Sequence, residues 1–222
     1  MIDLGDKKCV VTVFEGTDGS GKTSLLRLTA QMLRAREKVV VTYKTPSRTK
    51  TGAFAVGYGN RRGISPLTRM LLFLANTVED SQVMKGAVRR AGADYLLIDR
   101  YYLCSVVFGL AYIKYRGVSS DVTASRLIEV VEELGRGTLL NTDVYVIVDV
   151  EERERLARVS RGRKKGFLED VTIFQELVRE GYREFATSSR AEVIWVINEP
   201  NSLRDNAERL AAFLLSLSSS QD

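Results

Sequence analysis

The sequence predicts an α/β domain in which helices flank both faces of a five-stranded parallel sheet. Five short apolar runs, rich in β-branched residues, alternate with segments whose apolar residues recur at helical spacing. The 222 residues are 45% hydrophobic and 27% charged, which is ordinary for a globular domain. No repeat, low-complexity tract or linker divides them, so we expect one domain over residues 1–222.

The first half of the chain alternates strand and helix patterns. Cys9–Phe14 is the first predicted strand, and leucines at helical spacing predict a helix over Lys22–Arg36. A second strand is predicted over Val39–Tyr43. Lys44–Gly63 is rich in glycine and basic residues and shows no period, so we expect a long loop there. Ser65-Pro66 then opens a helical region that runs, with one possible break, to Arg90.

The second half repeats this alternation. The predicted strands are Tyr95–Ile98, Val144–Val150 and Val193–Ile197. The predicted helices are Cys104–Tyr115, Asp121–Leu134, Val171–Ala186 and Asn201–Leu217. Glu151–Val159 and a basic, glycine-containing stretch lie between the fourth strand and the helix Val171–Ala186. Parallel strands joined by helices require right-handed crossovers, which place helices on both faces of the sheet.

The composition excludes several kinds of chemistry. The chain has no histidine, so it has no Ser-His-Asp triad, no histidine-ligated zinc and no imidazole base. Cys9 and Cys104 form neither a ligand cluster nor a disulfide framework, which fits a reducing cytoplasm. We expect neither a membrane span nor a signal peptide. The net charge of +5 favours anionic partners in general and does not by itself indicate nucleic acid.

A phosphate-binding loop follows the first strand. Residues 16–23 read Gly-Thr-Asp-Gly-Ser-Gly-Lys-Thr and match G-x-x-x-x-G-K-[ST] between a strand and a helix. Glycines let backbone N–H groups turn toward phosphate oxygens, and the helix N-terminus adds its positive dipole end. Lys22 is expected to reach the β- and γ-phosphates, and the Thr23 hydroxyl to bind Mg²⁺. The loop residues predicted to bind ATP are Gly16, Thr17, Asp18, Gly19, Ser20, Gly21, Lys22, Thr23 and Ser24.

Asp99 ends the third predicted strand, where an acidic residue can hold Mg²⁺ through water. It is followed by Arg-Tyr-Tyr and not by the x-x-G of a GTPase switch, and the chain has no N-K-x-D for guanine. The alternative is that Asp99 only caps the next helix.

A second phosphate requires a second cation, and Arg100 is the nearest candidate. A basic cluster follows later, between acidic residues and with glycines at 162 and 166. Its members are Arg153, Arg155, Arg158, Arg161, Arg163, Lys164 and Lys165. We expect a lid over about residues 158–168 that closes on the transferring phosphoryl group and excludes water. The alternative is a solvated basic loop or a weak nucleic-acid patch.

Together these residues resemble the thymidylate kinases of the nucleoside monophosphate kinase group, over Val10 to about Ala186. The motifs that carry the resemblance are Phe14-Glu15-Gly16-Thr17-Asp18-Gly19-Ser20-Gly21-Lys22-Thr23, Leu71-Leu72-Phe73, Asp99-Arg100-Tyr101 and Val178-Arg179-Glu180-Gly181-Tyr182. The resemblance implies a P-loop NTPase fold with an arginine-rich lid. It also implies transfer from ATP to dTMP, giving ADP and dTDP, with Mg²⁺ and usually in a homodimer.

The resemblance implies roles for single residues. Asp18 would approach the acceptor's 3′-hydroxyl, Arg100 its 5′-phosphate, and Asp99 the metal. Phe73 would stack on the base, although plain core packing is the alternative, and Ser105 would contact the base edge. The implied acceptor-binding residues are Asp18, Phe73, Thr77, Arg100, Ser105 and Phe108.

The lid has implied roles as well. Gly19 stands where some members of the family carry a phosphate-loop arginine, and members with glycine there draw the catalytic arginine from the lid. The lid here offers Arg161 and Arg163 for that role. Arg158 fits the family's adenine-side arginine, so we add it to the ATP-binding residues.

Several positions depart from the family pattern and bear on the base. Lys44-Thr45-Pro46-Ser47-Arg48 replaces an acid or Phe followed by Pro-Gly-Gly. Thr77 stands where the family has an arginine that reads the thymine carbonyl, Phe108 replaces a tyrosine near the sugar, and Gly166-Phe167 stand near a usual Asp-Arg pair.

The leading hypothesis is an ATP-dependent dTMP kinase. The alternatives are a kinase for another nucleotide, a nucleoside or a 5′-hydroxyl end, or a regulatory ATPase without an acceptor. Arg100 and the lid cluster argue against the last, because hydrolysis alone requires no second phosphate site.

Overall fold

A computed structural model of the chain describes residues 2–3, 8–61, 63–119, 121–161 and 168–219. It confirms the predicted parallel sheet. The strands lie in the order β3 (Val40–Lys44), β4 (Tyr95–Asp99), β2 (Lys8–Gly16), β5 (Val144–Asp149) and β6 (Glu192–Ile197). A short strand that the sequence did not predict, β1 (Ile2–Asp3), pairs antiparallel with β2.

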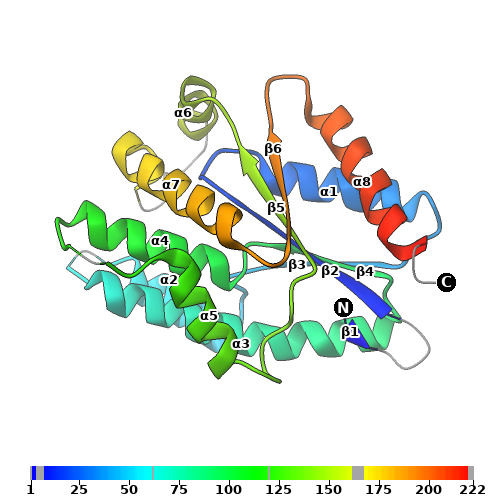
Figure 1. Cartoon of the computed structure of the whole chain (residues 1–222), viewed down its shortest axis with the longest axis horizontal. Helices are drawn as coiled ribbons and strands as arrows, with labels where there is room; N and C mark the ends of the chain where they lie inside the picture. The colour runs from blue at the N-terminus through cyan, green and yellow to red at the C-terminus, as the bar shows by residue number, and fades with distance from the viewer. Residues whose placement is uncertain (1, 4–7, 62, 120, 162–167, 220–222) are drawn as a thin grey trace.

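Helices cover both faces of the sheet (Figure 1). Helices α1 (Lys22–Arg34) and α8 (Leu203–Ser219) pack together on one face, over a core that includes Phe14 and Leu97. The other face carries the helices that form the second core. These are α3 (Pro66–Ala91), α4 (Tyr102–Tyr115), α5 (Ala124–Leu134) and α7 (Thr172–Ser188). Helix α6 (Glu152–Ser160) follows β5. The predicted helices are therefore present, with bounds that differ by a few residues.

The expectation of a long loop over Lys44–Gly63 is wrong, because a helix, α2 (Lys50–Gly59), occupies half of it. Thr49 caps this helix by accepting a hydrogen bond from the Gly52 N–H. A Cβ at Gly52 would lie 2.2 Å from the Ser47 carbonyl oxygen, and one at Gly59 would lie 3.3 Å from the Phe73 ring. The glycines thus allow close packing of α2 against its neighbours and do not mark a flexible segment.

Helix α3 runs without a break. Ser65 caps its start by accepting from the Thr68 N–H, and Pro66 occupies the first turn, where its missing N–H costs nothing. Gly92 ends it in a left-handed conformation with φ 56°. None of the helices in the described ranges is long and apolar enough to cross a membrane.

The strand register brings the predicted chemistry to one edge of the sheet. Asp99 at the end of β4 pairs with Phe14 of β2 on one side and with Lys44 of β3 on the other. Since the carboxyl ends of parallel strands meet at one edge, Asp99 and Lys44 lie beside the loop that follows β2.

Candidate functional site

The phosphate loop joins β2 to α1, and its backbone requires glycine. Gly19 has φ +81°, and a Cβ there would lie 2.9 Å from Val159 Cγ2 of α6. Gly21 has φ +92°, and its Cβ would lie 2.2 Å from the side-chain amide of Asn198. The left-handed backbone and the close approach of α6 therefore disfavour a side chain at position 19.

Lys22 lies buried at the centre of this loop. Its ammonium donates to the Gly16 and Thr17 carbonyl oxygens at 3.0 and 2.5 Å and to Ser20 Oγ at 3.4 Å. Burial, followed by the nearby Arg100 charge, lowers the pKa of Lys22 to about 8. The loop thus encloses the Lys22 ammonium, the one cation of the motif. Phosphate oxygens of a bound nucleotide would replace the Gly16 and Thr17 carbonyl oxygens as its partners.

Thr23 and Asp99 meet beside the loop, as predicted. The Thr23 hydroxyl donates to Asp99 Oδ2 at 2.5 Å, and Lys44 Nζ lies 2.9 Å from the same oxygen. Burial alone would raise the pKa of Asp99, but Lys44 and the Thr23 hydroxyl outweigh it and hold the pKa below its usual value. Asp99 Oδ1 is buried and has no hydrogen-bond partner among the described residues.

This donor set fits Mg²⁺. A hydroxyl and a carboxylate are hard oxygen ligands, and Mg²⁺ in phosphoryl-transfer sites takes one or two protein oxygens together with substrate phosphates. The described part of the chain contains no cluster of three or more cysteine, aspartate or glutamate side chains that could hold a metal alone.

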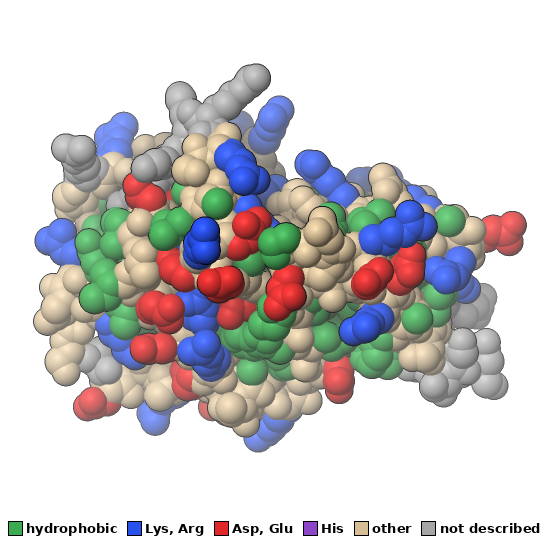
Figure 2. All heavy atoms as spheres, turned by 90° about the horizontal axis from the view of Figure 1, so that it is seen from above, with side chains coloured by type: hydrophobic (Ala, Val, Ile, Leu, Met, Phe, Trp, Pro, Cys, Tyr) green, Lys and Arg blue, Asp and Glu red, His purple; other side chains and the backbone are tan. Residues whose placement is uncertain are grey.

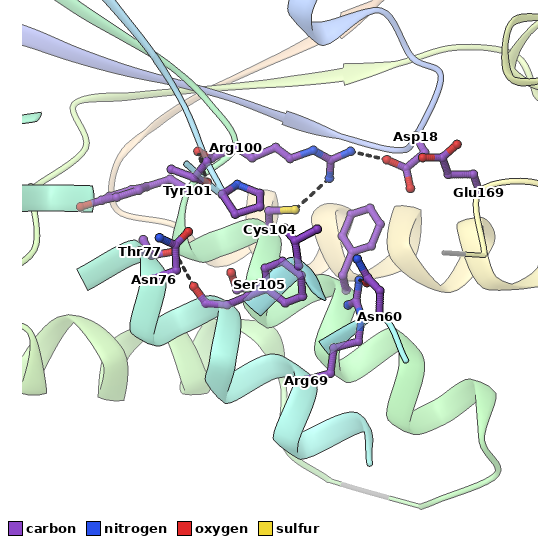
Figure 3. Close-up of a pocket in the computed structure, with 15 residues that line it drawn as sticks. Asp18, Asn60, Arg69, Asn76, Thr77, Arg100, Tyr101, Cys104, Ser105 and Glu169 are labelled. Carbon is purple, nitrogen blue, oxygen red and sulfur yellow. Dashed lines mark hydrogen bonds and ion pairs between the residues drawn. The ribbon is translucent and has the colours of Figure 1, made fainter. Parts of the chain in front are cut away.

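A cavity of about 210 Å³ opens next to the phosphate loop (Figure 3). All of the predicted acceptor-binding residues line it: Asp18, Phe73, Thr77, Arg100, Ser105 and Phe108. The remaining lining residues were not predicted to bind the acceptor: Thr45, Pro46, Val56, Asn60, Arg69, Asn76, Tyr101, Cys104 and Glu169.

Arg100 forms the charged end of the cavity. One terminal nitrogen of its guanidinium pairs with Asp18, the other donates to Cys104 Sγ at 3.0 Å, and the Phe108 ring lies below it at 5.2 Å. Burial would lower the pKa of Arg100, but Cys104 and Asp18 raise it well above its ordinary value, so the guanidinium stays charged. Asp18 belongs to the phosphate loop, so this ion pair joins the two sites.

Phe73 also lines the cavity. The Arg69 guanidinium carbon lies over its ring, 4.8 Å from the centroid. The Thr77 hydroxyl donates to the Phe73 carbonyl oxygen at 2.9 Å, so its only proton stays within α3. Arg69 could have been found in the sequence, because it stands one helical turn before Phe73 and therefore on the same face of α3.

Glu15 is a buried residue to which the sequence analysis gave no role. Its carboxylate accepts from the Tyr101 N–H at 2.8 Å, the Cys104 N–H at 3.2 Å and the Tyr182 hydroxyl at 3.0 Å. It thus caps the N-terminus of α4, directly after Arg100, whose φ is 70°. Burial raises the pKa of Glu15 to about 7, against the Tyr101 N–H, the Arg100 charge and the Tyr182 hydroxyl, which lower it.

The basic cluster of the predicted lid is divided by the structure. Arg155 is fully buried and donates to the Asp18 and Glu169 carbonyl oxygens at 3.3 and 2.5 Å. Its hydrogen bonds therefore connect α6 to the phosphate loop. Arg158 donates to the Ser20 carbonyl at 3.2 Å and the Asn198 carbonyl at 2.9 Å.

The remaining basic residues of the predicted lid are exposed or lie outside the described part of the chain. Arg161 is the exposed residue that ends α6. Arg163 lies outside the described residues, as do the glycines at 162 and 166, Lys164, Lys165 and Phe167. On the face shown in Figure 2, described basic and acidic side chains are interspersed.

Comparison with known proteins agrees with the geometry. The family model for thymidylate kinase matches residues 14–209. A thymidylate kinase of Nostoc sp. is 30% identical over 192 residues, which cover 83% of this chain and 85% of that protein. A thymidylate kinase of Trichormus variabilis is 29% identical over the same coverage. A probable thymidylate kinase of Caldivirga maquilingensis is 29% identical over 84% of this chain and 85% of its own length.

Proposed function

This chain belongs to the thymidylate kinase family, and we propose that it transfers the γ-phosphoryl group of ATP to dTMP, giving ADP and dTDP. The observation that carries the proposal is the pair of adjoining sites. A phosphate loop and a cavity with its own buried cation meet at the Asp18–Arg100 ion pair. Simple hydrolysis would require only the first of these sites.

On the donor side, we assign the triphosphate to the backbone N–H groups of residues 16–24. Lys22 would exchange its loop carbonyl partners for the β- and γ-phosphate oxygens. Thr23 and Asp99 would hold Mg²⁺, with the unpartnered Asp99 Oδ1 available to a metal-bound water. Mg²⁺, when bound, neutralises charge on the β- and γ-phosphates.

The lid arginines complete the donor side of the proposal. Arg158 lies between the Ser20 and Asn198 carbonyls, on the side of the loop where we place the adenine. Because position 19 is a glycine, the phosphate loop offers no arginine there to add to Lys22 in stabilising charge on the transferring group. We assign that role to Arg161 and Arg163.

On the acceptor side, Arg100 would bind the 5′-phosphate and Asp18 the 3′-hydroxyl. Binding of the phosphate would compete with the ion pair between these two side chains, so the acceptor would separate them and occupy the space between. Phe73 would stack on the base, with Ser105 and Phe108 lining the remaining wall.

We also propose that the chain acts in the cytoplasm and that two copies of it form a dimer through α3. Leu67, Leu71 and Val78 follow one face of this helix and are 53%, 53% and 39% exposed. An apolar stripe of this kind favours a protein contact. Sedimentation of the purified protein tests it: a dimer that Leu71→Glu converts to a monomer supports the assignment, and a wild-type monomer contradicts it.

The proposed reaction is tested by ADP release from Mg·ATP with dTMP, dUMP, UMP, CMP, AMP, GMP or water as acceptor. We expect dTMP to give the highest kcat/KM, formation of dTDP in equal amount to ADP, and little release with water alone. ADP release at the same rate with and without each acceptor monophosphate would show a regulatory ATPase instead. Release only with a different monophosphate would show a kinase for another base.

A further inference from the structure

The acceptor cavity contains two polar side chains without an assigned role, Arg69 and Asn76. Both lie on the face of α3 that carries Phe73, since residues three, four and seven positions apart share a helix face. A rise of 1.5 Å per residue separates their Cα atoms by about 10 Å along the helix, with Phe73 between them. Figure 3 shows Arg69 across the cavity from Arg100, with Asn76 beside Thr77.

Arg69 is held in place from two sides. Its guanidinium lies over the Phe73 ring, and one terminal nitrogen donates to Asn60 Oδ1 at 3.3 Å. Burial lowers the pKa of Arg69, whereas Cys104 and Asp18 act in the opposite direction. The guanidinium has therefore lost part of its hydration, and a hydrogen bond that it makes in the cavity is stronger than one made in water.

Asn76 is 1% exposed, and its contacts fix the orientation of its carboxamide. Its Nδ2 donates to Thr49 Oγ1 at 3.2 Å and to Thr51 Oγ1 at 3.3 Å. The Thr51 hydroxyl gives its only proton to Glu79, so toward Asn76 it can only accept.

This orientation leaves Asn76 Oδ1 as a buried acceptor. It has no hydrogen-bond partner among the residues that the structure describes. A buried acceptor without a donor is costly, and Asn76 is among the residues that line the cavity, so a ligand N–H that approached this oxygen would remove the cost.

We propose that Arg69 and Asn76 read the base of the acceptor nucleotide, Arg69 by donating to a ring carbonyl and Asn76 by accepting from a ring N–H. This inference rests on the proposed function. A guanidinium only donates and a carboxamide oxygen only accepts, so the pair matches a C=O beside an N–H. Thymine and uracil carry that imide at C4 and N3, whereas cytosine in the same position turns an amino group toward Arg69 and a bare ring nitrogen toward Asn76. Arg69 thus supplies the donor that Thr77 lacks.

The first test compares two arginines that both stack on a ring. Arg69→Ala is compared with Arg61→Ala, because Arg61 lies 5.1 Å from the Tyr58 ring centroid but is exposed and outside the cavity lining. We expect Arg69→Ala to raise the KM for dTMP by about 10- to 150-fold, the value of a hydrogen bond to a charged group. The KM for ATP should not change, Arg69→Lys should restore part of the loss, and Arg61→Ala should match the wild type.

The second test distinguishes hydrogen bonding of these side chains to the base from a role in maintaining the shape of the cavity. Calorimetry measures binding of dTMP, dCMP and 2-deoxyribose 5-phosphate, which has no base, to wild type, Arg69→Ala and Asn76→Leu. We expect both variants to lose preference for dTMP over dCMP and to bind the sugar phosphate as the wild type does. Equal loss for dTMP and the sugar phosphate would show a structural role and overturn the inference.

The two proposals fail in different ways. A folded wild type that does not phosphorylate dTMP contradicts the proposed function. A wild type that phosphorylates dTMP, together with an unchanged ratio of dTMP to dCMP affinity in Arg69→Ala and Arg69→Lys, contradicts only the base-reading pair. A wild type that binds dCMP as tightly as dTMP also contradicts it.

Discussion

The donor and acceptor sites of this kinase-family chain are built in opposite ways. The phosphate loop is one continuous segment, residues 16–23, whose backbone conformation provides most of the site. The acceptor cavity is lined by side chains from α2, α3, α4 and the segment before α7, brought together only by the fold. A site made of one continuous segment can be recognised from a short sequence motif. A site assembled from distant segments leaves no such motif, and each of its side chains can be substituted separately.

The difference has a consequence for substitution. The glycines of the phosphate loop are constrained by their neighbours, as the close approaches at Gly19 and Gly21 show. In the cavity, a contact that one position lacks can be supplied from another turn of the same helix. We therefore expect substitutions in the loop to abolish turnover and substitutions in the cavity to change selectivity.

The largest effect is expected for Lys22→Ala. The change removes the ammonium at the centre of the loop, and phosphoryl transfer should fall by at least about 10²- to 10³-fold, as for other lost electrostatic contacts. Steady-state turnover with dTMP measures it, with thermal melting to show that the protein folds. Lys114→Ala on exposed α4 surface is the matched control. More than about a tenth of wild-type turnover in Lys22→Ala would contradict the role of this lysine.

The next effect concerns Glu15, where the two sites meet. Its pKa is about 7 in the folded protein and 4.5 for an unperturbed carboxyl, so the folded state holds a proton that the unfolded state has lost. Stability from this group is present below pH 4.5 and is lost as the pH rises through 7, by about 3 kcal/mol in all.

Glu15→Gln removes that pH dependence. Urea unfolding at several pH values between 4 and 8 should show wild type losing stability relative to the variant as the pH rises. Glu129→Gln, on the exposed side of α5, should leave the pH profile of wild type unchanged. Parallel profiles for wild type and Glu15→Gln would mean that folding does not shift the pKa of this carboxyl.

The lid comes third. With glycine at position 19, Arg161→Ala combined with Arg163→Ala should lower kcat by about tenfold or more, because the lost contact forms chiefly in the transition state. The KM for ATP should change less than kcat. Arg153→Ala, at the start of α6, serves as the control. A change confined to the KM for ATP would make the pair ordinary binding residues.

The sequence predicted the local parts of the molecule well and the dispersed parts incompletely. The motif of the phosphate loop, the strand that places Asp99 and the order of helices follow from short-range patterns. Helix α2 was missed because Gly52 and Gly59 are typical of loops unless the packing partners are known. Asn76 and Glu15 were missed because their roles depend on contacts between distant segments, whereas the spacing of Arg69 to Phe73 on α3 was visible in the sequence.

The last and smallest effect is a change of base selectivity caused by substitution of Thr77. It tests whether an arginine one helical turn after Phe73 can replace Arg69, which lies one turn before it. Thr77 is buried and its hydroxyl donates its proton within α3, so it has none to donate to a carbonyl of the base. Thr77→Arg in an Arg69→Ala background should recover about tenfold of the lost preference for dTMP, within the range of one hydrogen bond to a charged donor. Thr77→Met adds a long side chain without donors and should recover none. The ratio of kcat/KM for dTMP and dCMP measures both. Equal recovery by methionine would mean that a long side chain at position 77 acts by filling space. A positive charge at position 77 would then contribute nothing to base selectivity.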